Sequence, residues 1–507
     1  MKKLLTIVML LITAIAATAR TNVVAHRGYW QTPGSAQNSI RALVKADSIG
    51  CAASEFDVWI TADDVLVVNH NADINGVVIE TEKSRKVLKQ KLANGERIPT
   101  LDKFLETARS LSVDLILEVK PHANPARENI AVDKIIRMVA DKGLTDRVTY
   151  ITFSRNAFDA LVANSGRPVF YLNPVRPNVF AEIGGFGPDY HINYFRKNPS
   201  WISTFKSMGM PINVWTVDSE TDLRWCVDHE VDFVTTNQPE LALRLCDEAA
   251  APIDLTVMTF NLRFGERASL DSIAAEIKAA NPDFVALQEV DVNTARTAAP
   301  DMNGKDMLTE LAARTGMFGL YAPAMTFAGG YYGVGILSRH PCVKSAVHEL
   351  PNPAGVEPRV MLQGDFRLNG HRPVTFCSTH LDVKSADTRH QQINHIRGIL
   401  APEQAPADTL NAKKCCGANT DAAKFFHPTI IAGDFNATAD EPALQTLCEF
   451  ADPVSCSDAT FPVEAPTRKI DHIYALPRCH ATLLDSAASL NTVSDHRAVI
   501  SRIRLTP

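Results

Sequence analysis

The stretch VVAHRGYW, residues 23–30, carries a short apolar run directly into His26-Arg27-Gly28. An apolar, β-branched run of this kind indicates a buried strand, and its end places a histidine and an arginine at the mouth of that strand. The other end of the chain has a similar feature, because TVSDHRAVI, residues 492–500, places Asp495-His496-Arg497 at the mouth of what the pattern indicates as the last strand. Both ends therefore join buried strands to side chains capable of chemistry.

The first half of the chain alternates β-rich runs with amphipathic helical segments, from residue 21 to about residue 248. This alternation predicts a mostly parallel sheet. The candidate strands are NVVAH (22–26), ASEFDVWI (53–60), VLVVNH (65–70), VDLILEVK (113–120), VTYITF (148–153), PVFYLN (168–173), PINVWTV (211–217) and VDFVTT (231–236), with DYHINYF (189–195) as a further one. About eight strands in this length favour a (β/α)₈ barrel of the TIM type, with an open doubly wound sheet as the alternative.

The polar residues of this half gather at the ends of its strands. They are His26 and Arg27 on the first, Glu55 and Asp57 on the second, His70 on the third, and Glu118 and Lys120 on the fourth. Residues two apart on a strand share one face. In a parallel barrel these ends meet on one rim, where such folds keep their active sites.

These residue types favour the cleavage of a phosphodiester. The carboxylates of Glu55, Asp57 and Glu118 are hard oxygen ligands, which favour Mg²⁺ or Ca²⁺ over zinc. Arg27 and Lys120 can hold phosphate oxygens. Histidines such as His26 and His70, on either side of a bound phosphate, can serve as general base and general acid.

The ordered motifs HRG, EFD, VVNH and LEVK resemble those of the glycerophosphodiester phosphodiesterase family over residues 21–248. The resemblance implies a barrel, a divalent metal on Glu55, Asp57 and Glu118, and His26 and His70 as the acid–base pair. It also implies that a neighbouring glycerol hydroxyl attacks phosphorus while a histidine takes its proton. The motif VWTV also resembles a motif of this family. This resemblance implies that Trp215 forms part of the wall of the substrate pocket.

Two positions depart from the family pattern. Gln37 stands before Asn38 where the family has a glutamate, and Asn71 follows His70 where the family has an aspartate. Neither change removes a proposed ligand or proton carrier, but Asn71 bears on how His70 is oriented.

A second alternating half follows LCDEAAAPID, residues 245–254, whose small and polar composition is typical of a linker. Its candidate strands are DLTVMTFNLRF (254–264), PDFVALQEVD (282–291), GVGILS (333–338), VTFCSTHLDV (374–383), PTIIAGDFNA (428–437), KIDHIYAL (469–476) and SDHRAVISRIR (494–504). Polar residues again end these strands, namely Asn261, Glu289, His380, Asp434 with Asn436, Asp471, and Asp495 with His496.

These strand ends favour attack by water on a phosphate ester. Asn261 and Glu289 can share a hard cation. A carboxylate such as Asp471 beside an imidazole such as His496 gives an oriented base, and Asp434 can steer the nucleophile.

The motifs FNLR, LQEV, GVGILS, STH, GDFN, KIDHI and SDH, in this order, resemble the endonuclease/exonuclease/phosphatase family from about residue 254 to the C-terminus. The resemblance implies a four-layer sandwich of two sheets between helices. It implies Glu289 as the main metal ligand with Asn261 and Asp495 nearby. It further implies His496 as the base, Asp471 as its orienter, Asp434 and Asn436 holding the nucleophile and transition state, and His380 on a phosphate oxygen.

Length and composition limit the remaining choices. A chain of 507 residues exceeds one ordinary core, and a net charge of −6 argues against a nucleic-acid partner. Lys2-Lys3, an apolar run and Ala17-Thr18-Ala19 predict a signal peptide over residues 1–19, and hence a periplasmic or secreted protein. No later run is long and apolar enough to span a bilayer.

The sequence thus predicts an exported, bifunctional, metal-dependent phosphoesterase with a barrel in residues 20–248 and a second domain in residues 254–507. The barrel is expected to cleave glycerophosphodiesters to glycerol phosphate and an alcohol. The second domain is expected to hydrolyse a phosphate mono- or diester of a small molecule or lipid headgroup. The alternatives are a chain in which one domain only binds phosphate or lipid, and a C-terminal nuclease; the oligomeric state is left open.

Overall fold

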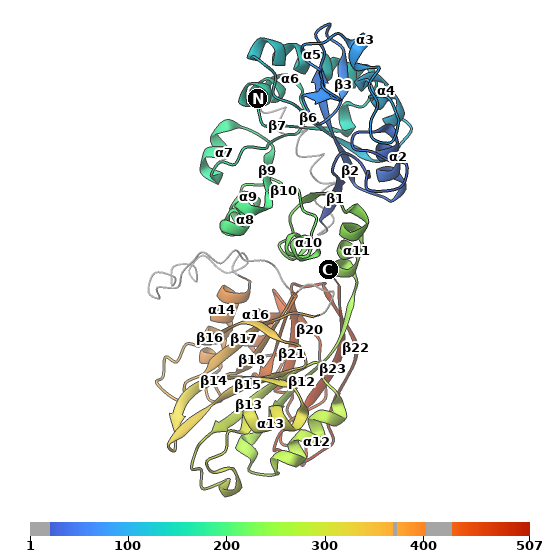
Figure 1. The fold of residues 1–507 in the computed structure, drawn as a ribbon. Helices are drawn as coiled ribbons and strands as arrows, with labels where there is room; N and C mark the ends of the chain where they lie inside the picture. The colour runs from blue at the N-terminus through green and yellow to red at the C-terminus, as the bar shows by residue number, and fades with distance from the viewer. Residues whose placement is uncertain (1–20, 369–372, 402–427, 507) are drawn as a thin grey trace. The chain divides into compact units, whose positions relative to one another are not determined.

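The computed structural model of the chain describes residues 21–368, 373–401 and 428–506. The expected signal peptide, residues 1–19, lies outside these ranges. The described chain divides into two compact units between Glu248 and Ala249 (Figure 1). In the ranges described, no helix combines the length and the apolar character that a membrane crossing requires.

The first unit is a closed barrel of eight parallel strands. Each strand pairs in parallel with the next around the barrel, and β1 closes it by pairing with both β2 and β11. The barrel strands are β1 (Asn22–Ala25), β2 (Ala53–Ile60), β6 (Asp114–Val119), β7 (Val148–Thr152), β8 (Val169–Tyr171), β9 (Gly187–His191), β10 (Asn213–Trp215) and β11 (Phe233–Thr236). The predicted (β/α)₈ barrel is confirmed, and the open doubly wound sheet is excluded.

One predicted barrel strand is wrong. VLVVNH forms β3 (Leu66–Val68), which pairs with β2 in antiparallel orientation and lies outside the closed ring. The eighth barrel strand is β9, which overlaps the first three residues of DYHINYF, a stretch that was expected only as a further strand. Because β2 and β3 form a hairpin, β3 runs back towards the rim, where Asn69 donates its backbone N–H to Asp57 O at 3.0 Å.

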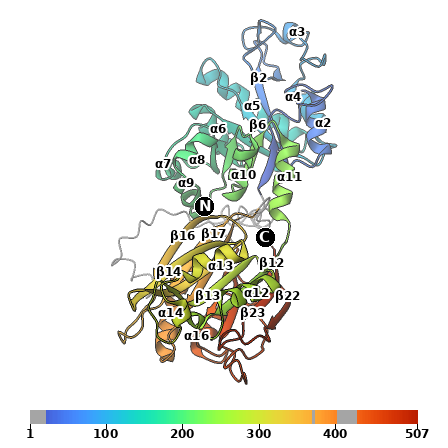
Figure 2. The ribbon, with the colours of Figure 1, turned by 60° about the horizontal axis from the view of Figure 1, so that its bottom comes forward.

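Helices cover the outside of the barrel, as the view in Figure 2 shows for α2, α4, α5, α6, α10 and α11. Several begin with a Ser, Thr or Asn whose side chain accepts a backbone N–H of the first turn, the usual N-cap arrangement. The helices are α2 (Ile40–Ser48), α4 (Leu101–Ala108), α5 (Pro125–Asp141), α6 (Arg155–Asn164), α7 (Pro177–Ile183), α8 (Ile192–Lys197), α9 (Ser200–Ser207), α10 (Glu220–Asp228) and α11 (Pro239–Ala250). A small insertion after β3 contains β4 (Asp73–Ile74), β5 (Val77–Val78) and α3 (Ser84–Val87).

The interior of the barrel is apolar at its base and polar towards the carboxyl ends of the strands. The apolar filling includes Val24, Ala53, Ile116, Ile151 and Phe170. Two residues further along β2 and β6, the next residues on the same face are charged. Alternation along each strand therefore delivers the predicted site residues to one end of a packed barrel.

The second unit has two six-stranded sheets packed face to face between helices. One sheet has the order β14-β15-β13-β12-β23-β22 and the other the order β16-β17-β18-β19-β21-β20. Helices α12 (Leu270–Ala280) and α13 (Met307–Thr315) cover the first sheet, whereas α14 (Ala386–Leu400) and α16 (Pro442–Cys448) cover the second (Figure 1). This arrangement confirms the predicted four-layer α/β sandwich.

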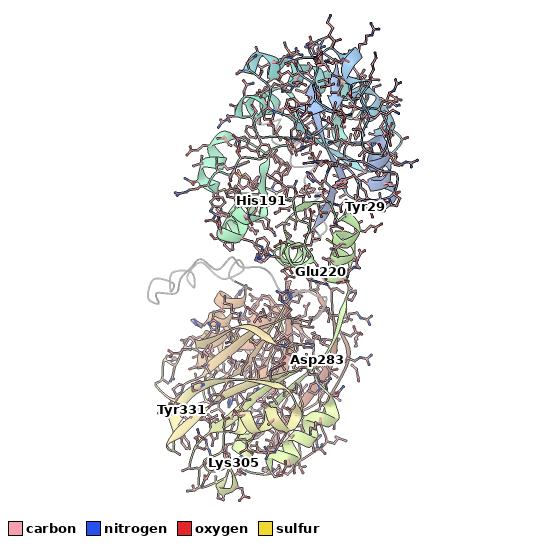
Figure 3. The ribbon with its side chains drawn as sticks, in the orientation of Figure 1. Tyr29, His191, Glu220, Asp283, Lys305 and Tyr331 are labelled. Atoms are coloured by element: carbon pink, nitrogen blue, oxygen red, sulfur yellow. The ribbon has the colours of Figure 1, made fainter. Side chains whose placement is uncertain are left out.

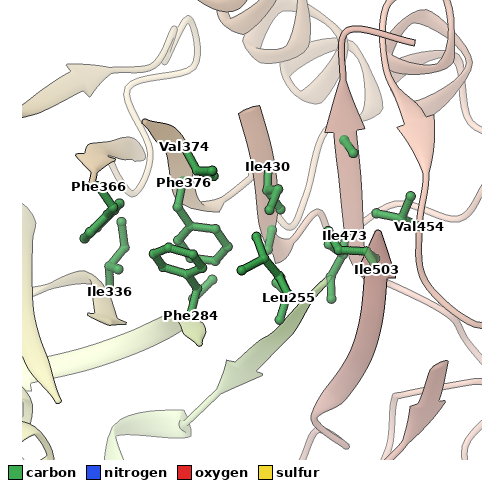
Figure 4. Packing of buried hydrophobic residues seen from close by; sticks show 14 of the residues in the cluster. Leu255, Phe284, Ile336, Phe366, Val374, Phe376, Ile430, Val454, Ile473 and Ile503 are labelled. Carbon is green, nitrogen blue, oxygen red and sulfur yellow. The ribbon is translucent and has the colours of Figure 1, made fainter. Parts of the chain in front are cut away.

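The two sheets meet in an apolar core. Phe284 on β13 (Phe284–Val292) stacks on Phe376 of β18 (Val374–His380) with ring centroids 5.0 Å apart, and Phe366 packs on it at 4.9 Å (Figure 4). Strands of both sheets contribute to this core. It holds the loops at the strand ends in fixed positions, which a catalytic site requires.

The strands at or near the sheet edges were not predicted. They are β14 (Phe318–Phe327), β16 (Cys342–Glu349), β17 (Val360–Phe366), β20 (Asp452–Pro453) and β22 (Ala481–Ala488). The predicted strands correspond to β12 (Ile253–Asn261), β13, β15 (Gly330–Ser338), β18, β19 (Thr429–Asp434), β21 (Asp471–Leu476) and β23 (Val499–Leu505). Strands such as β16 are largely exposed, so the continuous apolar runs that mark a buried strand are missing from them.

Candidate functional site

A tight turn after β1 positions the first predicted site residues. Arg27 has φ +57° and Gly28 has φ +75°, so the chain reverses immediately after His26. A side chain at position 28 would place its Cβ 2.7 Å from the Ala42 backbone, and only glycine fits. The turn directs the backbone N–H of Arg27 onto Glu55 Oε2 at 2.8 Å.

Three buried carboxylates meet beside this turn. Glu55, Asp57 and Glu118 each offer one oxygen within 4.8 Å of the others, and none of the three is more than 7% exposed. Glu55 Oε1 is buried, and no hydrogen-bond partner for it exists among the described residues. A cluster of buried oxygen ligands with an unpaired acceptor fits a divalent cation of the Mg²⁺ or Ca²⁺ type.

The pKa values of the carboxyls in this cluster also favour a cation site. Burial and the neighbouring Asp57 and Glu118 carboxylates raise the pKa of Glu55 well above its ordinary value. Burial and Asp57 raise the pKa of Glu118 to about 8. Burial also acts to raise the pKa of Asp57, but the charge of Lys120 holds it below its usual value. A bound cation opposes the first two shifts and allows all three groups to ionise together.

A hydrogen-bond chain fixes the His26 imidazole. His26 Nδ1 lies 2.9 Å from Asn237 Oδ1, which also accepts the Trp30 indole N–H at 2.9 Å. The Asn237 amide nitrogen donates to Asp218 Oδ2 at 2.9 Å, which sets the orientation of the amide. His26 Nδ1 must therefore donate, and this leaves Nε2 as a free acceptor 4.0 Å from Glu55 Oε2. Burial and the Arg27 charge lower the pKa of His26 to about 4, so the imidazole is neutral at neutral pH and its Nε2 can accept a proton.

We expect Asn237→Ala to lower kcat for glycerophosphocholine by about 10- to 100-fold, with little change in KM, because Asn237 positions the His26 imidazole. Steady-state kinetics of Asn237→Ala, His26→Ala and the double variant check this. The double variant should be no slower than His26→Ala, since the two groups act as one unit. Asn156→Ala, which removes a half-buried asparagine of α6 that does not line the pocket, is the matched control. Additive losses would show that Asn237 acts independently of His26.

Gln37 and Asn71, the two residues that depart from the family pattern, both make hydrogen bonds in the site. His70 Nδ1 lies 2.8 Å from Asn71 Oδ1, so the amide oxygen can orient His70 as a carboxylate would, without its charge. Gln37 Oε1 accepts a hydrogen bond from Arg27 at 2.7 Å. Each of the two positions thus presents a neutral amide oxygen where the family pattern has a carboxylate.

A pocket at this end of the barrel joins the predicted groups. His26, Arg27, His70, Lys120 and Trp215 all line it. Lys120 Nζ lies 2.8 Å from Glu118 Oε1 and 3.2 Å from Asp57 Oδ1, at the edge of the carboxylate cluster. The pocket therefore brings two histidines, two cationic groups and the carboxylates to one place.

The second unit has an imidazole held between two carboxylates. His496 Nδ1 lies 3.0 Å from Asp471 Oδ2, and His496 Nε2 lies 3.8 Å from Asp434 Oδ2. All three side chains are buried, with Asp471 fully so. The structure thus brings together the three residues for which the sequence predicts the roles of base, orienter of the base and group facing the nucleophile.

The three side chains shift one another's pKa values. Burial alone would lower the pKa of His496, but Asp471 and Asp434 together raise it to about 10. Burial and Asp471 raise the pKa of Asp434 to about 7. Positive charge bound nearby would lower the pKa of His496 and release it to act as a base.

His380 faces the same group of side chains. Arg359 donates to His380 Nδ1 at 3.0 Å, so the ring carries its proton on Nε2, which lies 3.5 Å from Asp434 Oδ2. Burial and the Arg359 charge lower the pKa of His380 well below its usual value. A neutral imidazole with its N–H towards the site can donate to a phosphate oxygen.

The predicted metal ligands of this unit lie next to the trio. Asn261 Nδ2 donates to Glu289 Oε1 at 3.0 Å and to Asp434 Oδ2 at 3.1 Å. Burial raises the pKa of Glu289, and the nearby Asp495 charge adds to the shift. Asp495 itself is paired with Arg263. Glu289 fits a cation ligand well, whereas Asn261 Oδ1 already accepts the backbone N–H of Arg263 at 3.0 Å.

Backbone geometry explains how two of these residues reach the site. A β-bulge between Leu287 and Val290 accompanies φ +55° at Glu289, which re-aims its side chain out of the strand. Asn436 has φ +50°, and its amide donates to Leu381 O at 3.1 Å. Asn436 therefore ties the loop after β19 to the loop after β18 and gives its backbone N–H to Asp434 Oδ1 at 2.9 Å.

Several residues of both sites carry no motif that the sequence pattern could reveal. In the barrel they are Asp189, Asp218 and Asn237. Asn38, which belongs to the family pattern, donates its amide to Asp57 Oδ2 at 2.8 Å. In the C-terminal unit they are Arg359 and Tyr332, which hydrogen-bond each other beside Glu289. Arg359 follows a proline-containing loop and has no motif around it, so only the fold reveals its position.

In comparisons with known proteins, each of the two units matches a family model. The model of the Glycerophosphoryl diester phosphodiesterase family matches residues 26–241. The model of the Endonuclease/Exonuclease/phosphatase family matches residues 258–496. Both predicted resemblances are confirmed.

Individual relatives cover single units. A glycerophosphodiester phosphodiesterase of Caldanaerobacter subterraneus is 25% identical over 251 residues, which span 45% of this chain and 98% of the relative. A solved glycerophosphodiester phosphodiesterase of Parabacteroides distasonis is 41% identical over 45% of this chain and 97% of that chain, with a TM-score of 0.44. A solved endonuclease/exonuclease/phosphatase of Beutenbergia cavernae is 22% identical over 50% of this chain and 72% of that one, with a TM-score of 0.37.

Proposed function

Because the chain belongs to the glycerophosphoryl diester phosphodiesterase family in its N-terminal half and to the endonuclease/exonuclease/phosphatase family in its C-terminal half, we propose that it is a bifunctional phosphoesterase with one catalytic centre in each half. The barrel hydrolyses glycerophosphodiesters to glycerol phosphate and an alcohol. The observation that carries this proposal is the buried Glu55–Asp57–Glu118 cluster beside an oriented, neutral His26.

The barrel residues divide the reaction between them. Arg27 and Lys120 bind phosphate oxygens, and His26 Nε2 takes the proton of the glycerol hydroxyl next to the phosphate. That oxygen forms a bond to phosphorus, the bond from phosphorus to the alcohol breaks, and His70 gives the leaving oxygen its proton. Water then opens the resulting cyclic diester to glycerol phosphate.

A divalent cation, Mg²⁺ or Ca²⁺, fits the cluster of Glu55, Asp57 and Glu118, where it supplies charge stabilisation to the phosphoryl oxygens. The residues of this chain hold and orient it. Asn38 fixes Asp57 by donating to one carboxylate oxygen, and the Arg27 backbone N–H fixes Glu55. These contacts keep the two carboxylates in place before any ion arrives.

We expect Glu55→Gln to lower hydrolysis of glycerophosphocholine by about 10²-fold or more, because the metal contributes several kcal/mol to stabilising the transition state. Titration calorimetry with Mg²⁺ and Ca²⁺ should show one bound ion fewer than in the wild-type chain. EDTA should abolish the wild-type activity, and added metal should restore it. Glu106→Gln, on the exposed face of α4, serves as the control. Full activity in EDTA would contradict the metal assignment.

The C-terminal half is proposed to hydrolyse a second phosphate mono- or diester of a small molecule or lipid headgroup. His496, oriented by Asp471, takes a proton from water that Asp434 and Asn436 position, and His380 donates to a phosphate oxygen. Glu289, with Asn261 and Asp495 nearby, holds a divalent cation. The net charge of −6 supports a small or headgroup substrate rather than a nucleic acid.

The proposal also covers the organisation and destination of the chain. Its catalytic domains comprise residues 20–248 and 254–507. Residues 1–19 act as a signal peptide that exports the chain to the periplasm or the medium, a proposal supported by the basic, apolar and small-residue segments at the N-terminus.

A further inference from the structure

The pocket of the barrel has another polar wall that the proposed reaction leaves unused. Strand β9 lies opposite β2 around the eight-stranded ring, and β10 lies opposite β6. Asp189 on β9 and Thr235 on β11 line the pocket together with the catalytic groups. Asn213 on β10 pairs with Asp189 in the strand register. Asp189 and Asn213 therefore lie on the strands opposite those that carry the Glu55–Asp57–Glu118 cluster.

Asp189 is a buried carboxyl with an unmet hydrogen bond. Its residue is 1% exposed, and Oδ1 finds no hydrogen-bond partner in the part of the chain that the structure describes. Tyr190, its neighbour on the strand, packs outward on Phe195 and Phe205, so Asp189 faces the barrel interior. An unpaired buried carboxyl oxygen is costly, and in native structures it calls for a ligand or another function.

The neighbours of Asp189 are arranged to hold it. Asn213 and Thr235 exchange hydrogen bonds at 3.0 and 3.1 Å, which fixes the amide of Asn213 beside the carboxyl. The Trp215 indole N–H donates to the backbone oxygen of Asp189 at 2.9 Å. The Trp215 ring in turn meets the ring of His191 edge to face, with centroids 5.4 Å apart. His191, labelled in Figure 3, is the last residue of β9. The carboxyl is therefore rigidly placed in the pocket wall.

We propose that Asp189, with Asn213 and Thr235 behind it, forms a hydroxyl-binding subsite that receives the terminal hydroxyl of the glycerol moiety. This inference rests on the proposed glycerophosphodiesterase function and names how the same pocket recognises its substrate. Leu172 and Ile151 also line the pocket, and their apolar side chains suit the carbon chain of glycerol. The pocket has a volume of about 100 Å³, which accommodates a small polyol.

A hydroxyl suits this wall better than the ammonium of a leaving alcohol. Burial raises the pKa of Asp189 to about 8, and the hydrogen bond from Asn213 only partly opposes the shift. A carboxyl that is largely protonated at neutral pH can both donate to and accept from a hydroxyl. An ammonium ion would instead require the charged carboxylate and would lose its own hydration.

The test compares two substrates that differ by one hydroxyl. They are glycerophosphocholine and the analogue in which propane-1,2-diol replaces glycerol, so that only the terminal hydroxyl is missing. We expect the wild-type chain to prefer glycerophosphocholine by about 10- to 100-fold in kcat/KM, the usual consequence of leaving a buried polar group unpaired. In Asp189→Ala this preference should fall to about one, and hydrolysis of the analogue should stay near the wild-type level.

Two further variants keep the test decisive. Asp189→Asn keeps the size of the side chain and should weaken the preference if Asp189→Ala does not fold. Asp232→Asn changes a carboxyl at the opposite end of β11, which accepts the Ile212 backbone N–H at 2.8 Å, and should leave the preference intact. An unchanged preference in both Asp189 variants would overturn the proposal. The proposal would also be overturned if the Asp189 variants lost the wild-type selectivity between glycerophosphocholine and glycerophosphoethanolamine. That result would mean that Asp189 contacts the leaving alcohol and not the glycerol.

Binding separates this inference from the proposed function. Calorimetry with sn-glycerol 3-phosphate and with propane-1,2-diol phosphate needs no turnover. If the chain cleaves no glycerophosphodiester yet prefers glycerol phosphate through Asp189, the proposed function fails and the subsite stands. Equal binding of both compounds to the wild-type chain overturns the subsite whatever the activity.

Discussion

Replacing His26 with alanine is expected to lower the hydrolysis of glycerophosphocholine by about 10²- to 10⁴-fold, the usual contribution of an acid–base residue. The reason is geometric, because the Asn237–Asp218 chain leaves only His26 Nε2 free to take a proton. Since the pKa of His26 is lowered to about 4, the imidazole is neutral at and above neutral pH, and protonation removes the base only as the pH falls towards that value. The measurement is kcat/KM of the purified chain from about pH 3.5 to 9.

His229→Ala is the matched control for this variant, because His229 lies at the end of α10 and bonds to Trp225 O at 2.7 Å, outside the pocket. It should keep the wild-type rate. Near-normal turnover by His26→Ala on every glycerophosphodiester tested would contradict the assignment of His26.

The other large effect concerns His496 and Asp471. His496→Ala should reduce the C-terminal activity by about 10²-fold or more, and Asp471→Asn somewhat less, because one is the base and the other its orienter. The 3.0 Å contact between them makes the two a unit, so their losses should not add. The measurement is a double-mutant cycle, with p-nitrophenyl phosphorylcholine and bis(p-nitrophenyl) phosphate as probes that contain no glycerol.

Asp471→Asn in the His496→Ala background should therefore cost little beyond His496→Ala alone. Neither change should alter the hydrolysis of glycerophosphocholine. Fully additive losses would show that Asp471 has a separate role, such as holding the strand β21 in the sheet.

Both architectures could be predicted because their central strands are continuous apolar runs that end in polar residues. The sequence could not separate VLVVNH from DYHINYF as the eighth barrel strand. VLVVNH is as apolar as a parallel strand but returns in a hairpin, with Thr61 donating its backbone N–H to Val65 O at 2.9 Å. DYHINYF is more polar than a typical buried strand because Asp189 lies inside the barrel, where a functional residue breaks the apolar pattern.

The candidate sites could be predicted as far as motifs mark strand ends. His26, Glu55, Asp57 and Glu118 follow from their strands, and His496 from SDH. Residues that orient them could not be found in this way, since Asn237 reaches His26 across 211 positions of sequence. Such contacts depend on how the barrel closes, which no local pattern encodes.

The site of the C-terminal unit shows the same division. Asp471 and His496 carry recognisable motifs, and the structure brings them into contact. Arg359 has none, yet it determines which nitrogen of His380 carries the proton. Short-range sequence signals thus identify the groups that perform chemistry, whereas long-range packing selects the groups that set their tautomers and charges.

The most direct test of two separate catalytic centres measures both activities side by side in four full-length proteins: wild type, His26→Ala, His496→Ala and the double variant. Glycerophosphocholine reports on the barrel, and p-nitrophenyl phosphorylcholine reports on the C-terminal half. The account predicts that each single variant loses one activity and keeps the other, and that the double variant loses both. Loss of both activities in either single variant, with the fold intact by circular dichroism, would contradict it.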